Sequence, residues 1–75
     1  MPPLPTLTSR ELIRVLLKLG FFIDHQKGSH ARLIHIRDLW RRVTVPMHDR
    51  DLPKGTLKSI LRQAELSVDE LIENL

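Results

Sequence analysis

The chain has 75 residues, which is enough for one domain with a small core and leaves no room for a second. It contains no cysteine, so disulfides and thiolate metal sites are excluded, and this absence fits a reducing compartment. The N-terminal segment has neither the basic region of a signal peptide nor the apolar run of a membrane span. We therefore expect a cytoplasmic protein with an extended, proline-rich arm at residues 1–7 and a single domain at residues 8–75.

Charge is unevenly distributed along the sequence. Twelve lysines and arginines against nine aspartates and glutamates give a net charge of +3. The basic residues concentrate in the middle of the chain, whereas the acidic residues gather mainly in the C-terminal tail. A basic centre fits a polyanionic partner such as nucleic acid, and the alternative is an ordinary solvated surface of mixed charge.

The first predicted element is a helix that begins after Thr8 and stops at Gly20. Thr8 is followed three residues later by Glu11, which is the pattern of a capping box. Apolar residues then recur on one broad face, and charged residues share the opposite side. Glycine readily ends a helix, so Gly20 predicts the stop. The pattern predicts an amphipathic helix with one buried face.

Three strands are predicted next, over residues 21–25, 29–36 and 41–45. Short connections separate them, with a turn at Lys27-Gly28 after the first strand and residues 37–40 after the second. Connections this short join antiparallel neighbours, so we expect a three-stranded antiparallel meander. Pro46 ends the third strand.

Two more helices complete the predicted order. The polar loop 46–53 ends at Pro53, a residue suited to the start of a helix. Helically spaced apolar residues follow, namely Leu57, Ile60, Leu61 and Ala64. Ser67 and Glu70 form a second capping box before a short terminal helix. The α-β-β-β-α order with this extra helix predicts an α+β fold, a two-layer sandwich with a three-stranded antiparallel sheet.

The second predicted helix carries a basic ridge. Lys54, Lys58 and Arg62 are spaced by four residues, so their side chains line one side of the helix. Lys54 also stands in the first turn, where free backbone amides and the helix dipole favour an anion. Such a ridge suits contact with duplex phosphates, and it is equally common on a plain solvated helix face.

The segment Lys27-Gly28-Ser29-His30 is the most informative stretch of the chain. It sets an imidazole just after a glycine turn, at the start of a strand. An ordinary imidazole has a pKa of about 6.5, so it both accepts and donates protons near neutrality. A hairpin closed symmetrically about Lys27-Gly28 predicts that His25 lies directly opposite His30. This pair could divide acid and base roles, but it has no accompanying carboxylate, and we expect no metal site.

The other two histidines fit structural positions. His35 is an odd number of residues from His30, so strand alternation sends it to the opposite, partly buried face. His48 lies in the polar loop and is expected to be exposed to solvent. Taken without further information, His30 itself is compatible with an exposed strand residue that has no function.

Several short motifs follow one another in a characteristic order between about Ser9 and Leu66. They are Ser9-Arg10-Glu11-Leu12-Ile13, Gly20-Phe21, Lys27-Gly28-Ser29-His30, Arg42-Val43-Thr44-Val45-Pro46 with His48, and the segment from Lys54 to Ala64. Each motif is short, but their joint order and spacing are specific. In these motifs the chain resembles the HicA toxin family, the small mRNA interferases of bacterial and archaeal toxin–antitoxin systems.

The resemblance implies a HicA-like domain whose fold is similar to that of double-stranded RNA-binding domains. It also implies a ribonuclease toxin that cleaves mRNA and is neutralised by a HicB-type antitoxin. The histidine of the Gly-Ser-His motif is the family's catalytic residue, and this position is His30 here. We expect RNA to be bound by Lys27, Gly28, Ser29, Arg42, Lys54 and Lys58, without a metal or organic cofactor.

The expected mechanism is simple because RNA supplies its own nucleophile, the 2′-hydroxyl group. The enzyme then needs a proton acceptor or donor, His30, and cations for the developing charge.

Two alternatives to a ribonuclease stay open. One is a non-catalytic module that binds double-stranded RNA, and the other is a protein-binding adaptor whose interface includes Trp40. Trp40 is expected either to contact a partner or to pack as a cap on its turn.

Overall fold

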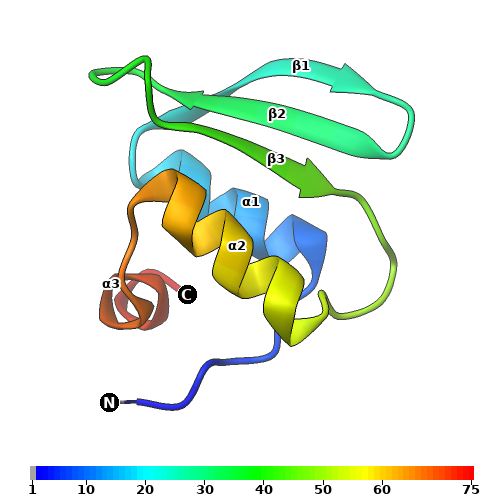
Figure 1. Ribbon diagram of the computed structural model, residues 1–75, viewed down its shortest axis with the longest axis vertical. Helices are drawn as coiled ribbons and strands as arrows, with labels where there is room; N and C mark the ends of the chain where they lie inside the picture. Colours follow the sequence, from blue (N-terminus) through cyan, green and yellow to red (C-terminus); the bar gives the residue numbers. More distant parts are fainter. Residues whose placement is uncertain (1) are drawn as a thin grey trace.

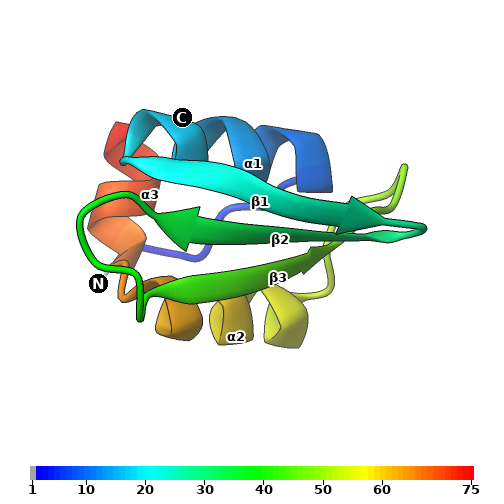
Figure 2. The ribbon, with the colours of Figure 1, turned by 90° about the horizontal axis from the view of Figure 1, so that it is seen from above.

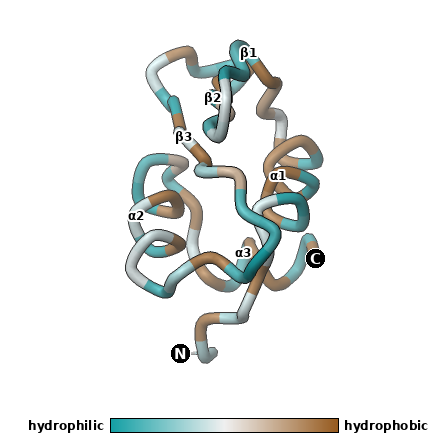
Figure 3. The backbone as a smooth tube through the Cα atoms, turned by 90° about the vertical axis from the view of Figure 1, so that its right-hand side faces the viewer, coloured by the Kyte–Doolittle hydropathy of each residue, from teal (hydrophilic) through white to brown (hydrophobic). Residues whose placement is uncertain are grey.

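The computed structural model describes residues 2–75, and it confirms the predicted α+β order. The elements are α1 (Ser9–Lys18), β1 (Phe21–Lys27), β2 (His30–His35), β3 (Arg42–Pro46), α2 (Lys54–Ala64) and α3 (Val68–Glu73). The sheet has the strand order β1-β2-β3, with both pairs antiparallel. Figures 1 and 3 show α1 and α2 side by side under one face of the sheet, which gives the two predicted layers.

The core lies between the sheet and the two long helices. The strand faces that point toward the helices carry mostly apolar residues, and the helices present their leucine-rich sides to them. Residues at the centre of this core are Leu12, Leu16, Leu33, Val43, Val45, Leu57 and Ile60, all almost inaccessible to solvent. Because the core lies on only one face of the sheet, the other face is left uncovered within residues 2–75 (Figure 2).

Both predicted capping boxes form. In α1, the Thr8 hydroxyl accepts a hydrogen bond from the Glu11 amide, and the Glu11 carboxylate accepts one from the Thr8 amide at 2.9 Å. Bonds from the Thr8 backbone and side chain lower the pKa of Glu11 below its ordinary value of 4.5. A depressed folded-state pKa means that this stabilisation is present above the ordinary value and is lost as the pH falls through the lowered one.

The hairpin between β1 and β2 turns one residue later than the sequence predicts. β1 extends to Lys27, and Gly28 and Ser29 form the turn. Gly28 has a φ of +57° at the first turn position, where hairpin turns of type II′ require glycine. A β-bulge just before His25 shifts the register by one residue. Because the turn lies at Gly28 and Ser29, Lys27 lies opposite His30, and the prediction of a directly opposed His25–His30 pair is wrong.

His35 confirms its predicted place on the inner, partly buried side of the sheet. Its Nδ1 accepts a hydrogen bond from the Arg37 amide at 3.1 Å, so the ring proton lies on Nε2, which donates to the Leu19 carbonyl at 3.0 Å. The ring also packs edge-on against Phe21, with centroids 5.0 Å apart. A Cβ at Gly20 would lie 2.9 Å from Nε2, which explains why this position requires glycine.

One end of the molecule gathers segments that are far apart in the sequence. The hairpin turn, the end of β3 and the first turns of α1 and α2 all lie there (Figures 1 and 2). The fully buried Ser9 hydroxyl donates to the Pro46 carbonyl at 2.6 Å and accepts from the His48 amide at 3.1 Å. The Met47 amide donates to the Ser29 carbonyl at 2.6 Å. These bonds fix the hairpin turn and the β3 end relative to α1.

The predicted arm at residues 1–7 begins at residue 1, which lies outside the described residues. Residues 2–7 contain no helix or strand, and Leu7 is buried in the core. The Leu52 amide donates a hydrogen bond to the Leu7 carbonyl at 2.7 Å, which ties this segment to the loop before α2. Within residues 2–75, no helix combines the length and the apolar character needed to cross a bilayer.

The two unobstructed glycines give a first prediction about stability. A Cβ added at Gly28 or Gly55 would meet no atom within 4 Å, so only backbone conformation distinguishes the two sites. Gly28→Ala should lower the free energy of unfolding by about 1 kcal/mol, because the left-handed conformation strains alanine. Gly55→Ala, within α2, should raise it by about 0.5–1 kcal/mol. Urea denaturation measures both changes in the free energy of unfolding. Changes of the same sign would contradict the backbone conformations assigned to the two glycines.

Candidate functional site

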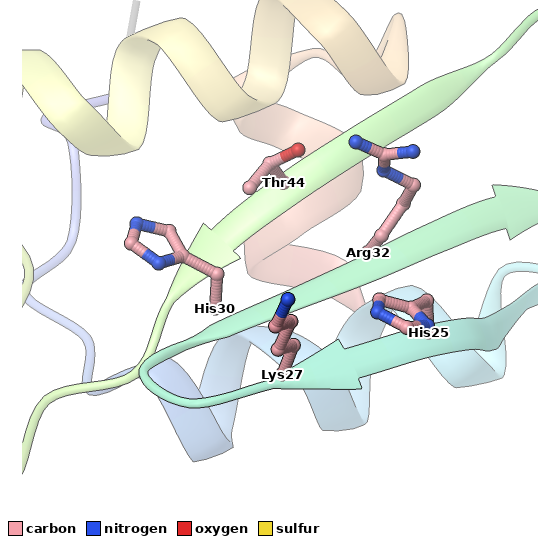
Figure 4. A pocket seen from close by; sticks show the side chains of 5 residues that line it. All are labelled: His25, Lys27, His30, Arg32 and Thr44. Carbon is pink, nitrogen blue, oxygen red and sulfur yellow. The ribbon is translucent and has the colours of Figure 1, made fainter.

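The uncovered face of the sheet holds a cluster of basic and hydrogen-bonding side chains. On this face Lys27 lies opposite His30, and Arg32 lies opposite both His25 on β1 and Thr44 on β3. Figure 4 shows these five side chains over the three neighbouring strands, with Lys27 and His30 at the hairpin end. They line an open hollow of about 400 Å³. The hollow defined by these five residues is the candidate site.

His30 stands at the edge of this hollow and is exposed to solvent. It is the first residue of β2, directly after the turn, and Pro46 of β3 lies on its other side. Its Nδ1 lies 3.3 Å from the Ser29 hydroxyl, a contact that holds one side of the ring. Within residues 2–75, Nε2 has no protein partner, so this nitrogen can reach a ligand.

Two cations flank the imidazole on the same face. Lys27 is directly across the β1–β2 pair, where facing Cβ atoms lie about 5 Å apart. Arg32 is two residues along β2, about 7 Å from His30 along the strand. Within residues 2–75 neither side chain is held in a hydrogen bond or ion pair, so both charges stay available to an anion. An anionic ligand over the hollow would therefore meet an imidazole and two cations.

The structure separates the other basic residues predicted for the site. Arg42 lies on the same face but at the far end of β3, where its guanidinium donates to the Leu39 carbonyl at 2.8 Å. Lys54 borders a hollow with Leu4 and Leu52, and Lys58 borders one with Pro2, both in the helix layer. The structure therefore brings Lys27, Gly28 and Ser29 together with His30, but neither Lys54 nor Lys58 lines its hollow.

The hollow also contains three residues that the sequence analysis did not assign to the site, namely His25, Arg32 and Thr44. Arg32 follows His30 by two positions, so strand alternation alone could have placed it on the same face. The places of His25 and Thr44 depend on cross-strand register. Within residues 2–75, no three His, Asp or Glu side chains lie together as a possible metal site.

Trp40 lies in the connection between β2 and β3, at the opposite end of the sheet from the hairpin turn (Figure 1). Its side chain is 90% exposed, so it does not pack as a cap on this turn. Its neighbours Leu39 and Ile36 are also more than half exposed. The ring of Trp40 is therefore available for contact with a partner, the other of the two expectations.

Comparison with known families bears directly on this fold and site. The family model described as the HicA toxin of bacterial toxin–antitoxin systems matches residues 9–66. The match runs from the first residue of α1 to just beyond α2, and it includes all three strands and the turn before His30. No match was found among curated proteins. The chain therefore belongs to the HicA toxin family, the toxins that are paired with an antitoxin partner.

Proposed function

We propose that this toxin is an endoribonuclease that cleaves mRNA in the cytoplasm, with His30 as general acid and base, and that a HicB-type antitoxin restrains it. The observation that carries this proposal is the exposed imidazole of His30 beside the free cations of Lys27 and Arg32. Nuclease chemistry on RNA needs a proton-transfer group and positive charge around one phosphate, and this hollow supplies both. Family membership supports the toxin role independently.

The proposed reaction begins when Nε2 of neutral His30 accepts the proton of a ribose 2′-hydroxyl group. The 2′-oxygen then attacks the adjacent phosphorus, and the bond between phosphorus and the 5′-oxygen of the next nucleotide breaks. The leaving oxygen takes a proton from the imidazolium of His30, directly or relayed through one water molecule. The products are a 2′,3′-cyclic phosphate and a 5′-hydroxyl end, and His30 returns to its neutral form.

The remaining residues of the hollow act on the phosphate. The ammonium of Lys27 and the guanidinium of Arg32 would neutralise the charge that develops on the phosphoryl oxygens. Gly28 has no side chain, so the turn backbone can approach the phosphate closely. The Ser29 hydroxyl, 3.3 Å from Nδ1, would hold the imidazole plane toward the RNA. With His30 as the one group assigned to proton transfer, we expect slow turnover, which is sufficient for a growth-arresting toxin.

The ends of the cleaved RNA test this mechanism. Purified protein should cleave an unstructured RNA in the presence of excess chelator at an unchanged rate, because every proposed group belongs to the protein. The upstream fragment should carry a 2′,3′-cyclic phosphate, detected by mass spectrometry. The same oligonucleotide with 2′-deoxyribose at the cleaved position should resist cleavage there. A strict requirement for a divalent ion, or cleavage of the deoxy substrate, would contradict the proposal.

A further inference from the structure

We propose that the RNA enters this site as a single strand that lies across the open face of the sheet, from His30 at the hairpin end toward Trp40 at the opposite end. This inference rests on the proposed function and adds the substrate form and the binding surface. A double-stranded RNA-binding fold leads to the opposite expectation, namely a duplex held by the helix layer.

The charge of the open face favours a polyanion. Lys27, Arg32 and Arg42 supply positive charge along its length, from the hairpin end to the far end of β3. The residues paired in register on this face include no aspartate or glutamate, and Asp24, an exposed carboxylate of β1, stands unpaired at the bulge. Because the face is uncovered within residues 2–75, a strand of RNA can reach the whole row without any rearrangement of the fold (Figure 2).

The far half of the same face offers apolar surface for bases. Phe22 lies opposite Ile34 on this side of the sheet, and Phe22 keeps 38% of its surface exposed. Beyond it, the connection after β2 presents Trp40, which is 90% exposed. Aromatic side chains beside a basic track are the usual means of binding single-stranded nucleic acid, because unpaired bases stack on them. A duplex keeps its bases stacked on each other and cannot use these rings.

The helix-layer cations argue against a duplex at this active site. Lys54 and Lys58, the residues expected to grip duplex phosphates, border hollows formed with residues of the N-terminal segment. These hollows lie in the layer behind the sheet, whereas His30 projects from its open face. A duplex held along α2 would therefore contact the helix layer and not the hollow that His30 lines.

The chemistry of cleavage also favours a single strand. Attack by the 2′-oxygen requires this oxygen, the phosphorus and the leaving 5′-oxygen to lie in one line. The stacked A-form helix holds the 2′-oxygen away from that line, whereas an unpaired strand can rotate into it. A binding surface that supports unpaired nucleotides next to His30 thus supplies the geometry that the reaction needs.

The test separates binding from cleavage by using RNA that cannot react. The probe is a fluorescein-labelled, fully 2′-O-methylated oligonucleotide of about 12 nucleotides, a length typical of single-strand sites. It is titrated with the wild-type protein, alone and annealed to its complement, and fluorescence anisotropy reports the dissociation constant at several salt concentrations. We expect the single strand to bind about tenfold more tightly than the duplex, with steep salt dependence.

Three charge reversals locate the surface. Arg32→Glu should weaken single-strand binding about tenfold, because it reverses the charge at the centre of the open face. Arg14→Glu, an equal change in net charge on the exposed side of α1, should change it less than about twofold. Lys58→Glu tests whether the helix layer contributes to binding, and its loss of affinity is compared with that of Arg32→Glu. Circular dichroism confirms that each variant is folded.

Tighter binding of the duplex, or a larger loss from Lys58→Glu than from Arg32→Glu, would overturn the inference. The inference would also be overturned if the Arg32→Glu protein bound the single strand as tightly as the wild type. That result would indicate that the open face binds a protein partner instead. Cleavage of unmodified RNA by the wild-type protein is measured in a separate assay. If the wild-type protein binds the single strand as expected but does not cleave it, the ribonuclease proposal is refuted and the binding surface is not.

Discussion

Replacing His30 with alanine is expected to reduce the rate of RNA cleavage by about 100- to 10,000-fold, the contribution of one positioned proton-transfer group. His30 is the imidazole that combines exposure, a held ring and a neighbouring free lysine. Because the side chain is exposed on a strand surface, its removal should leave the thermal unfolding temperature nearly unchanged. Cells that express the variant should therefore keep growing while they accumulate folded protein.

His25→Ala is the matched control for this experiment. His25 lines the same hollow and is also exposed, but it faces Arg32 and stands two residues before Lys27 on β1. Its loss should reduce cleavage less than about tenfold, since it contributes surface rather than proton transfer to the scissile linkage. If His25→Ala abolished cleavage and His30→Ala did not, the roles proposed for the two imidazoles would be wrong.

Local sequence signals predicted the elements of the fold well because each signal has a local physical cause. Thr8 and Glu11, like Ser67 and Glu70, satisfy free helix amides within one turn, and both pairs form as predicted. The periodic leucines and isoleucines of α2 face the sheet. Short connections forced the antiparallel meander, because longer crossovers were not available.

The candidate site was predicted less completely because it depends on register between strands. The turn lies at Gly28 and Ser29, one residue later than the sequence predicted, and this shift changes the partner of His30 from His25 to Lys27. Spacing along α2 placed Lys54 and Lys58 on one ridge, but spacing does not tell on which side of the sheet this ridge lies. Arg32 was missed although its two-residue offset from His30 was visible in the sequence.

The structural role of Ser9 could not be predicted from any local sequence pattern. It is the first residue of α1, where a serine reads as an ordinary helix-start residue. In the fold its hydroxyl is fully buried and joins two backbone groups that are 37 and 39 positions away in the chain. One of these groups belongs to Pro46, the strand neighbour of His30. Ser9 therefore links the stability of the fold to the geometry of the hollow.

Ser9→Ala should lower the free energy of unfolding by about 2 kcal/mol. The substitution leaves the Pro46 carbonyl and the His48 amide without their buried partner, and an unpaired buried polar group costs about 1–3 kcal/mol. For a domain of this size such a loss lowers the unfolding temperature by roughly 10 °C. Thermal and urea denaturation followed by circular dichroism measure the effect directly.

Ser59→Ala is the control, because the Ser59 hydroxyl lies on α2 and accepts only one long bond, 3.3 Å from the Gln63 amide nitrogen. Its loss should change stability by less than about 0.5 kcal/mol. An equal effect of the two substitutions would show that the buried hydroxyl is not the link between α1 and the end of β3. If the Ser9 hydroxyl links α1 to the end of β3, the Ser9→Ala protein should also cleave RNA more slowly than the wild type at temperatures where it is fully folded. The end of β3 would then no longer hold the strand beside His30 in one position.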